Sequence, residues 1–315
     1  PRKSHVLKNA DIKVKEVEAE VVSVQNYMLA ITAGGTIKKV TAKNYSMSNK
    51  ALSDNSALTD VHSQVLSCTS ADTILIFSDA GNVIKVPVDK LKECKWRDKG
   101  FAMNEIDKAA STKETAIAAL VAGKGTDVLF FTKAGMVKRS TLADTLTQKS
   151  YYQAVKIAEG DSLIGVEYLD SKKKILMLSA NGMSLAFDAA DVPSQGRVSG
   201  GVKGINLDDG DSVVFAGQFA ENEEVIATSS NGYLKKIPCS AFALSSRYRK
   251  GLKYFALTGK AVVCFAMLAS SSTTLAVDFG LKILPLETKT FKQSDRLSEG
   301  ELIIKRKALG IYKFC

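Results

Sequence analysis

Short apolar runs recur along the chain, and each ends in a polar, glycine-containing turn followed by a strand that mixes apolar and basic residues. The clearest copy covers residues 226–237, in which a run ending at Thr228 leads into Ser229-Ser230-Asn231-Gly232, and an apolar-basic strand follows. Glycine adopts the positive φ that such tight turns require, and two apolar runs joined by a turn of this kind favour a β-hairpin. The pattern therefore predicts a hairpin with Gly232 in its turn.

The same hairpin pattern occurs six times. Its turn glycines are separated by 46, 54, 47, 50 and 48 residues and are Gly35, Gly81, Gly135, Gly182, Gly232 and Gly280. A repeat of about fifty residues is typical of propellers and related arrays. Each repeat offers four short apolar segments, which predicts an all-β, six-bladed, propeller-like ring (a β-pinwheel) with about four strands per blade, in which radial closure protects the sheet edges. Within the second repeat, residues 103–123 fit either a helical turn or a further strand.

The expected blades lie near residues 17–68, 69–122, 123–170, 171–220, 221–270 and 271–315, which together form one domain over residues 17–315. Residues 1–16 are polar and carry charges of both signs, so we expect a linker there. The chain begins at Pro1 without a methionine, which suggests a piece of a longer protein.

Composition adds three constraints. The 315 residues are 45% hydrophobic, as expected for a protein with a packed core, and 43 Lys and Arg against 33 Asp and Glu give a net charge of +10, which favours polyanionic partners. The five cysteines are widely spaced and lack a Cys-x-x-Cys pair, which argues against a disulfide framework or a zinc site. No apolar run is long enough for a membrane span, so we expect a cytoplasmic protein with no membrane partner.

The sequence contains few residue patterns that would indicate catalysis. His5 and His62 are far apart in sequence, and Asp208-Asp209 falls in a predicted turn, where turn chemistry accounts for the carboxylates. The glycine-rich residues 196–204 lack the Gly-Lys-Ser/Thr of a phosphate-binding loop and precede no helix. We therefore predict no catalytic residue, cofactor site or metal site in this chain.

Basic residues return at two places in the repeat. The first is the strand leaving each hairpin, with Lys38, Lys39, Lys85, Lys138, Arg139, Lys235, Lys236 and Lys282. The second is the following loop and strand, with Arg97, Lys99, Lys149, Lys156, Arg197, Lys203, Arg247, Arg249, Lys250, Lys253, Lys292 and Arg296. Equivalent positions fall at equal angles around a ring, so these side chains are expected to form a band on its perimeter that neutralises the phosphates of a bent DNA duplex. The alternative for any one lysine is that it only protects an exposed strand edge.

These features resemble the C-terminal domain of the A subunit of bacterial type IIA topoisomerases, the enzymes that include DNA gyrase and topoisomerase IV. The resemblance rests on the repeated Gly-x-apolar-Lys-Lys/Arg hairpins and on residues 196–211, with their Gly-Arg, Gly-Val-Lys-Gly and Gly-Asp elements. It implies a non-catalytic domain that binds and bends double-stranded DNA. Its protein partners would be the ATPase B subunit of the enzyme and the cleavage core that precedes this domain, with ATP and Mg²⁺ bound elsewhere in the enzyme. The isolated domain would be a monomer, and the protein bacterial and associated with the nucleoid.

The first repeat bears on the subfamily. Gyrase carries a Gln-Arg-Arg-Gly-Gly-Lys-Gly box there, and the corresponding residues 45–58 have none, which favours topoisomerase IV. A gyrase domain with a degenerate box and, from another class, a protein-interaction propeller remain alternatives. Leu185 and Ala186 replace the basic residues of the fourth hairpin, so a weak point in the DNA band is expected there.

Overall fold

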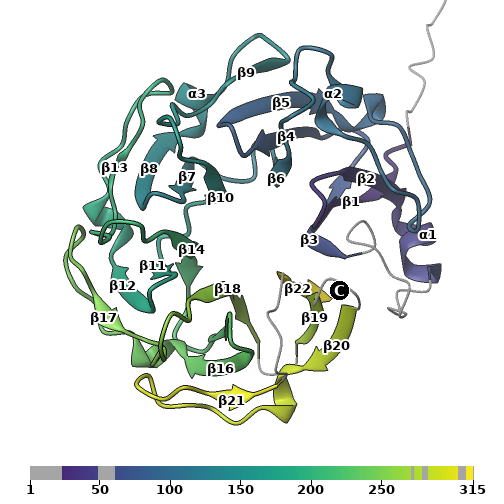
Figure 1. Cartoon of the computed structure of the whole chain (residues 1–315). Coiled ribbons are helices and arrows are strands. Elements are labelled where there is room, and N and C mark those ends of the chain that lie inside the picture. Colours follow the sequence, from purple (N-terminus) through teal and green to yellow (C-terminus); the bar gives the residue numbers. More distant parts are fainter. Residues whose placement is uncertain (1–22, 49–60, 271–272, 279–282, 304–309, 315) are drawn as a thin grey trace, which may run out of the picture.

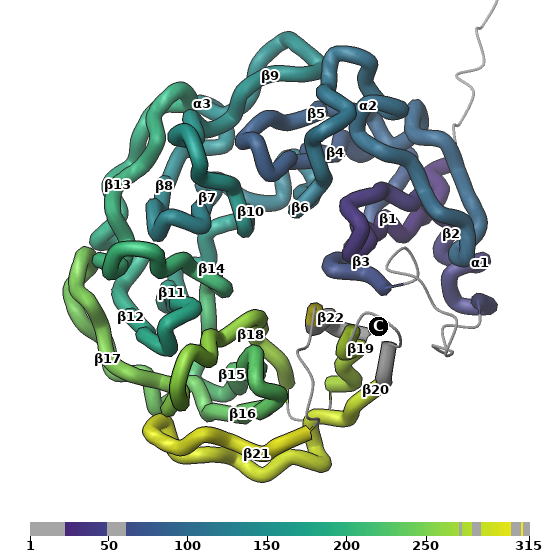
Figure 2. The backbone as a smooth tube through the Cα atoms, viewed as in Figure 1, coloured from purple at the N-terminus to yellow at the C-terminus, as the bar shows by residue number. Residues whose placement is uncertain are grey.

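The chain runs once around a ring with a central opening, and its ribbon is built almost entirely of short antiparallel strands (Figure 1). This computed structural model describes residues 23–48, 61–270, 273–278, 283–303 and 310–314. The tube in Figure 2 passes through the sheets in sequence order, and β22 (Gly310–Phe314) contacts β3 (His62–Thr69), so the last sheet lies against the first. The fold is all-β and propeller-like, as predicted.

The described residues form six antiparallel sheets arranged around the ring. Strands are given in the order of their hydrogen-bonded neighbours: the first sheet is β2 (Ile37–Thr41), β1 (Asn26–Thr32) and β3, and the second is β6 (Ala116–Val121), β4 (Thr73–Ser78), β5 (Asn82–Pro87) and β9 (Tyr151–Gln153). The third sheet is β10 (Leu163–Tyr168), β7 (Asp127–Thr132), β8 (Met136–Thr141) and β13 (Val202–Lys203), and the fourth is β14 (Val213–Phe219), β11 (Lys174–Ser179), β12 (Met183–Phe187) and β17 (Leu252–Lys253). The fifth sheet is β18 (Val263–Ala269), β15 (Glu224–Ser229), β16 (Tyr233–Pro238) and β21 (Glu301–Leu302), and the sixth is β20 (Ile283–Glu287), β19 (Thr274–Asp278) and β22.

Short helices follow the second strand of the hairpins. They are α1 (Ala42–Met47), η2 (Val88–Lys90), α3 (Leu142–Thr145), η3 (Ala189–Asp191), η4 (Cys239–Ala241) and η5 (Thr288–Thr290), and a further turn, α2 (Met103–Ile106), lies in the second repeat. Residues 103–123 thus hold both of the expected alternatives, the helical turn α2 and the strand β6. None of the helices in the described residues is long and apolar enough to cross a membrane.

The outermost strand of a sheet comes from the following repeat. The strands β9, β13, β17 and β21 each pair with the second hairpin strand of the preceding repeat, and in the first sheet this pairing is reduced to one bridge between Ile37 and Phe101. The sheet of β19 has no such partner among the described residues. Five blades therefore have their outer partner among the described residues, and the prediction of six blades was wrong: the outer strand of each of these five comes from the next repeat.

Glycine allows an outer strand to pair closely with the sheet of the preceding repeat. Gly251, which precedes β17, has a φ of +79°, and a Cβ added to it would lie 2.1 Å from the carbonyl oxygen of Ser184 in β12. A side chain at this position would push the outer strand away from the sheet that it joins.

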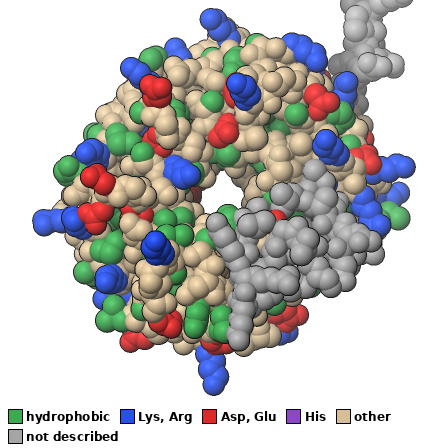
Figure 3. All heavy atoms as spheres, in the orientation of Figure 1, with side chains coloured by type: hydrophobic (Ala, Val, Ile, Leu, Met, Phe, Trp, Pro, Cys, Tyr) green, Lys and Arg blue, Asp and Glu red, His purple; other side chains and the backbone are tan. Residues whose placement is uncertain are grey.

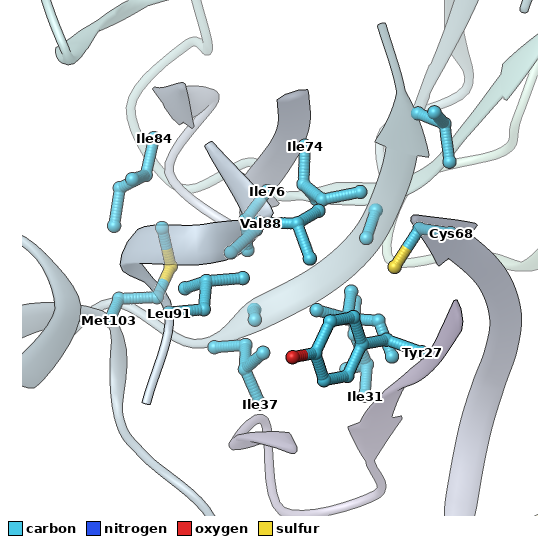
Figure 4. Close-up of a cluster of buried hydrophobic side chains, with 14 of the residues drawn as sticks. Tyr27, Ile31, Ile37, Cys68, Ile74, Ile76, Ile84, Val88, Leu91 and Met103 are labelled. Carbon is cyan, nitrogen blue, oxygen red and sulfur yellow. The ribbon is translucent and has the colours of Figure 1, made fainter. Parts of the chain in front are cut away.

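The apolar side chains lie between neighbouring sheets. Figure 4 shows one such cluster, in which Tyr27, Ile31 and Ile37 of the first sheet face Ile74 and Ile76 of the second. The central strand β15 is buried along its whole length, because sheets pack against both of its faces. The turn of its hairpin is as predicted, with a φ of +89° at Gly232.

Candidate nucleic-acid interface

The hairpin lysines do not lie on the surface. Their exposed fractions are 0% for Lys38, 4% for Lys39, 1% for Lys138, 0% for Lys235 and 7% for Lys236. The expectation that these five side chains form a DNA-facing band was wrong, because the outer strand and loop of the next repeat cover them. Lys282 lies outside the described residues.

Lys235 shows what the buried lysines do instead. Its Nζ donates hydrogen bonds to the carbonyl oxygens of Tyr254 at 2.8 Å, Arg296 at 2.7 Å and Ser298 at 2.7 Å. Three acceptors match the three N–H donors of an ammonium group. Lys235 therefore joins its own repeat to the loop of the next one.

Lys38 and Lys138 are equivalent to Lys235 in the first and third hairpins. Lys138 Nζ donates to the carbonyl oxygens of Ala154 at 3.0 Å and Arg197 at 2.6 Å, and Lys38 Nζ donates to that of Trp96 at 2.9 Å. Burial lowers the pKa of both Lys138 and Lys235 to about 8, which opposes the preference of the carbonyl oxygens for the ammonium form.

The same hairpin position is apolar in the intervening repeats. Ile84 and Leu185 occupy it and are 1% and 3% exposed. This position faces the interior in the first five repeats, so Leu185 and the equally buried Ala186 do not mark a weak point in a DNA band, contrary to the prediction.

The basic side chains one residue further along each hairpin also contact groups within the protein. Lys39 donates to the carbonyl oxygen of Val88 at 3.0 Å, and Lys236 lies 3.2 Å from the Glu224 carboxylate. The half-buried Arg139 pairs with Asp127 at 2.6 Å, and Lys85 donates to the carbonyl oxygen of Thr147. Few of these cations are free to meet a phosphate.

The second predicted group does lie at the surface. Its exposed members are Arg97, Lys99, Lys149, Lys156, Lys203, Arg249, Lys250, Lys253 and Lys292, and Arg197, Arg247 and Arg296 are partly exposed. They belong to the outer strands and to the loops on either side of them. Figure 3 shows Lys and Arg side chains projecting around the outline of the ring, with acidic and apolar side chains between them. We call this group the rim cations.

Three of the rim arginines make the same contact. Their Nη1 atoms donate to carbonyl oxygens of the preceding repeat's outer strand, at 2.8 Å from Arg197 to Gln153, 2.6 Å from Arg247 to Lys203 and 2.6 Å from Arg296 to Lys253. Sequence reasoning missed this contact, although the regular spacing of the arginines, 50 and 49 residues, is visible in the chain. Each arginine ties neighbouring outer strands together and keeps part of its guanidinium at the surface.

Two further rim contacts are exposed. Lys250 Nζ lies 2.5 Å from the Asp208 carboxylate, with both side chains more than 60% exposed, so solvent weakens this pair. Lys203 Nζ lies 5.2 Å from the centre of the Tyr248 ring. The rim therefore offers cations beside an aromatic surface.

Metal-binding side chains do not gather in the part of the chain that the structure describes. It holds no group of three or more His, Cys, Asp or Glu side chains placed to bind a metal ion. His62 stacks on Trp96 with ring centres 4.0 Å apart, and burial, together with the charge of Lys38, lowers its pKa to about 3. Asp211, in the turn that also holds Asp208, accepts hydrogen bonds from the backbone N–H groups of Asn181 and Ser212.

The structure is a propeller-like ring with basic loops along its outer strands. The family model described as "DNA gyrase C-terminal domain, beta-propeller" matches residues 72–101, 126–170, 173–219 and 223–267, more than half of the chain. The chain belongs to this family.

Curated relatives include A subunits of both DNA gyrase and DNA topoisomerase 4. The A subunit of DNA gyrase from Staphylococcus epidermidis is 26% identical over 302 residues, which cover 91% of this chain and 34% of the relative. The A subunit of DNA topoisomerase 4 from Staphylococcus aureus is 28% identical over 254 residues, which cover 77% of this chain and 31% of the relative. The chain therefore spans about a third of the length of these relatives.

Solved structures show the same fold. The crystal structure of the C-terminal domain of DNA topoisomerase IV superposes with a TM-score of 0.81 at 24% identity, over 93% of this chain and 94% of the other. The structure of the DNA gyrase A C-terminal domain gives a TM-score of 0.66 at 19% identity, over 92% and 100%.

Proposed function

We propose that this domain binds double-stranded DNA along its outer rim and bends it. The observation that carries the proposal is the placement of the rim cations: they recur in the outer strand and loop of successive repeats, so they follow the curvature of the ring. Lys and Arg at such positions neutralise phosphates and release counterions without reading base sequence. The proposed contacts are the rim cations, not the buried hairpin lysines.

We propose further that the domain serves a bacterial topoisomerase IV, in the cytoplasm and close to the nucleoid. There it would present a DNA segment to the cleavage core of the same polypeptide for decatenation or relaxation, with the catalytic tyrosine, ATP, Mg²⁺ and the ATPase B subunit supplied by the rest of the enzyme. Support comes from the missing basic box within residues 45–58, of which 49–58 lie outside the described residues. The isolated domain would be a monomer.

The DNA track is tested by the salt dependence of binding. A variant carrying Lys203→Glu, Arg249→Glu and Lys253→Glu changes three exposed side chains, and we expect weaker binding of a fluorescent duplex. The slope of log K against log salt should fall by about 0.9 for each phosphate that is no longer neutralised. The matched control is Lys172→Glu, an exposed lysine in the connection between β10 and β11. Unchanged affinity in the triple variant, or an equal decrease in the control, would refute the rim track.

Two experiments distinguish the proposal from the alternatives. When nicked plasmid is bound by the wild-type domain and then religated, we expect the plasmid to keep little writhe. Strong positive writhe would instead indicate a gyrase-type wrapping domain. A DNA affinity that stays flat as salt rises would indicate a protein-interaction ring whose lysines only maintain solubility.

A further inference from the structure

Three rim loops hold an apolar side chain out in solvent directly after the rim arginine. Val198 is 58% exposed, Tyr248 50% and Leu297 63%, and they follow Arg197, Arg247 and Arg296. The spacing of these apolar residues is 50 and 49 residues, so one stands in each of the fourth, fifth and sixth repeats. Asp98 takes the equivalent place in the second repeat, where it accepts a hydrogen bond from the backbone N–H of Lys95.

The loops that carry these side chains are fixed in place. The backbone N–H of Ser199 donates to the carbonyl oxygen of Gly196 at 3.3 Å, and that of Ser298 donates to the carbonyl oxygen of Asp295 at 3.1 Å, which closes a turn around each arginine and its apolar neighbour. The buried ammonium groups of Lys138 and Lys235 hold the same loops from below. The apolar side chains are therefore presented on ordered backbone.

Tyr248 carries backbone strain as well. Its φ is +63°, and it alone among the non-glycine residues of the described chain has a positive φ. Its N–H donates to the carbonyl oxygen of Gly204 at 2.6 Å. A bulky residue is strained in this region, and proteins retain such strain most often at functional positions.

We propose that Val198, Tyr248 and Leu297 contact the sugar edges of the DNA minor groove and wedge against its base steps where the duplex passes over the rim. The proposal rests on the proposed function and adds an apolar component to it. A motif repeated in three consecutive repeats suits a repetitive ligand that follows the ring better than a single protein surface. The flanking Arg197, Arg247 and Arg296 supply the charge, and proteins that bend DNA commonly combine inserted apolar side chains with cations in the minor groove.

The test compares a triple variant, Val198→Ser, Tyr248→Ser and Leu297→Ser, with the wild-type domain. We expect roughly tenfold weaker duplex binding, because the variant buries less apolar surface against DNA, and a smaller bend measured by energy transfer between the duplex ends. The slope of log K against log salt should not change, because no cation has been removed. Netropsin, a minor-groove ligand, should compete with the wild-type domain.

A single variant separates function from folding. Tyr248→Gly relieves the positive φ, so the domain should become more resistant to thermal unfolding while its DNA affinity falls. Wild-type affinity and bending in both variants would overturn the inference while leaving the rim track intact. A wild-type domain that binds no DNA would instead refute the proposed function itself.

Discussion

The Lys235 ammonium lies 2.7 Å from the carbonyl oxygen of Arg296, so a buried side chain of one repeat holds the rim loop of the next. The Arg296 guanidinium in turn reaches back to the carbonyl oxygen of Lys253, in the repeat that contains Lys235. The two contacts join consecutive repeats in both directions. The integrity of the ring thus depends on cations as well as on apolar packing.

Lys235→Met should destabilise the domain without removing any exposed cation of the DNA track. The substitution keeps most of the side-chain volume but leaves three carbonyl oxygens without their donor, which we expect to cost about 2–4 kcal/mol in urea-induced unfolding. Lys253→Met, at an exposed rim position, should stay within about 0.5 kcal/mol.

The two variants should behave oppositely toward DNA. Because Lys235 is buried, folded Lys235→Met protein should keep the wild-type slope of log K against log salt, whereas Lys253→Met should lower it. A reduced slope for folded Lys235→Met would show that Lys235 reaches a phosphate and would contradict the structural role.

Much of the strand pattern could be predicted, because it is local. The apolar runs and the turn glycines predict hairpins such as that around Gly232, and the spacing of those glycines predicts a ring. The position of Lys235 could not be predicted in this way. A lysine in an apolar strand has the same local pattern whether water or another backbone lies above it, and here the covering backbone comes from a repeat some sixty residues later.

A signal of the interior position was nevertheless present in the sequence. Ile84 and Leu185 alternate with the three lysines at the same hairpin position, and an apolar residue in that register indicates a buried site. The exposure of the rim cations was easier to predict, because most of them fall in loops, where side chains reach solvent.

His62 should make the domain sensitive to acid. Its pKa is about 3 in the folded protein and about 6.5 when unfolded, so the imidazole is neutral in the fold and takes up a proton on unfolding below pH 6.5. The stabilisation from a neutral His62 is fully present above pH 6.5 and is lost as the pH falls toward 3. At pH 5 the domain has lost about 2 kcal/mol of it.

Thermal unfolding between pH 7 and pH 5 measures the effect of His62. His62→Phe keeps a ring that can stack on Trp96 and cannot be protonated, so the variant should lose less stability over this range than the wild type. Equal losses in the two proteins would show that other groups cause the acid sensitivity.

Gly251→Ala should detach an outer strand from its sheet. The added Cβ would lie 2.1 Å from the Ser184 carbonyl oxygen, so β17 must move away from β12 or the backbone must distort, and we expect a loss of about 3 kcal/mol or more. Gly210→Ala is the matched control, because its φ of +78° is nearly the same but no atom lies within 4 Å of the added Cβ. It should cost only the backbone strain, about 1 kcal/mol.

Hydrogen exchange distinguishes the mechanism from a general loss of stability. In Gly251→Ala the amides of β12 and β17 should exchange faster than in wild type, while those of the second sheet, β4 to β6, should change little, because each outer strand completes one blade. DNA binding should weaken, since Arg249, Lys250 and Lys253 lie on the displaced segment. If the two alanine variants lost equal stability, close backbone approach would not be what requires glycine at position 251.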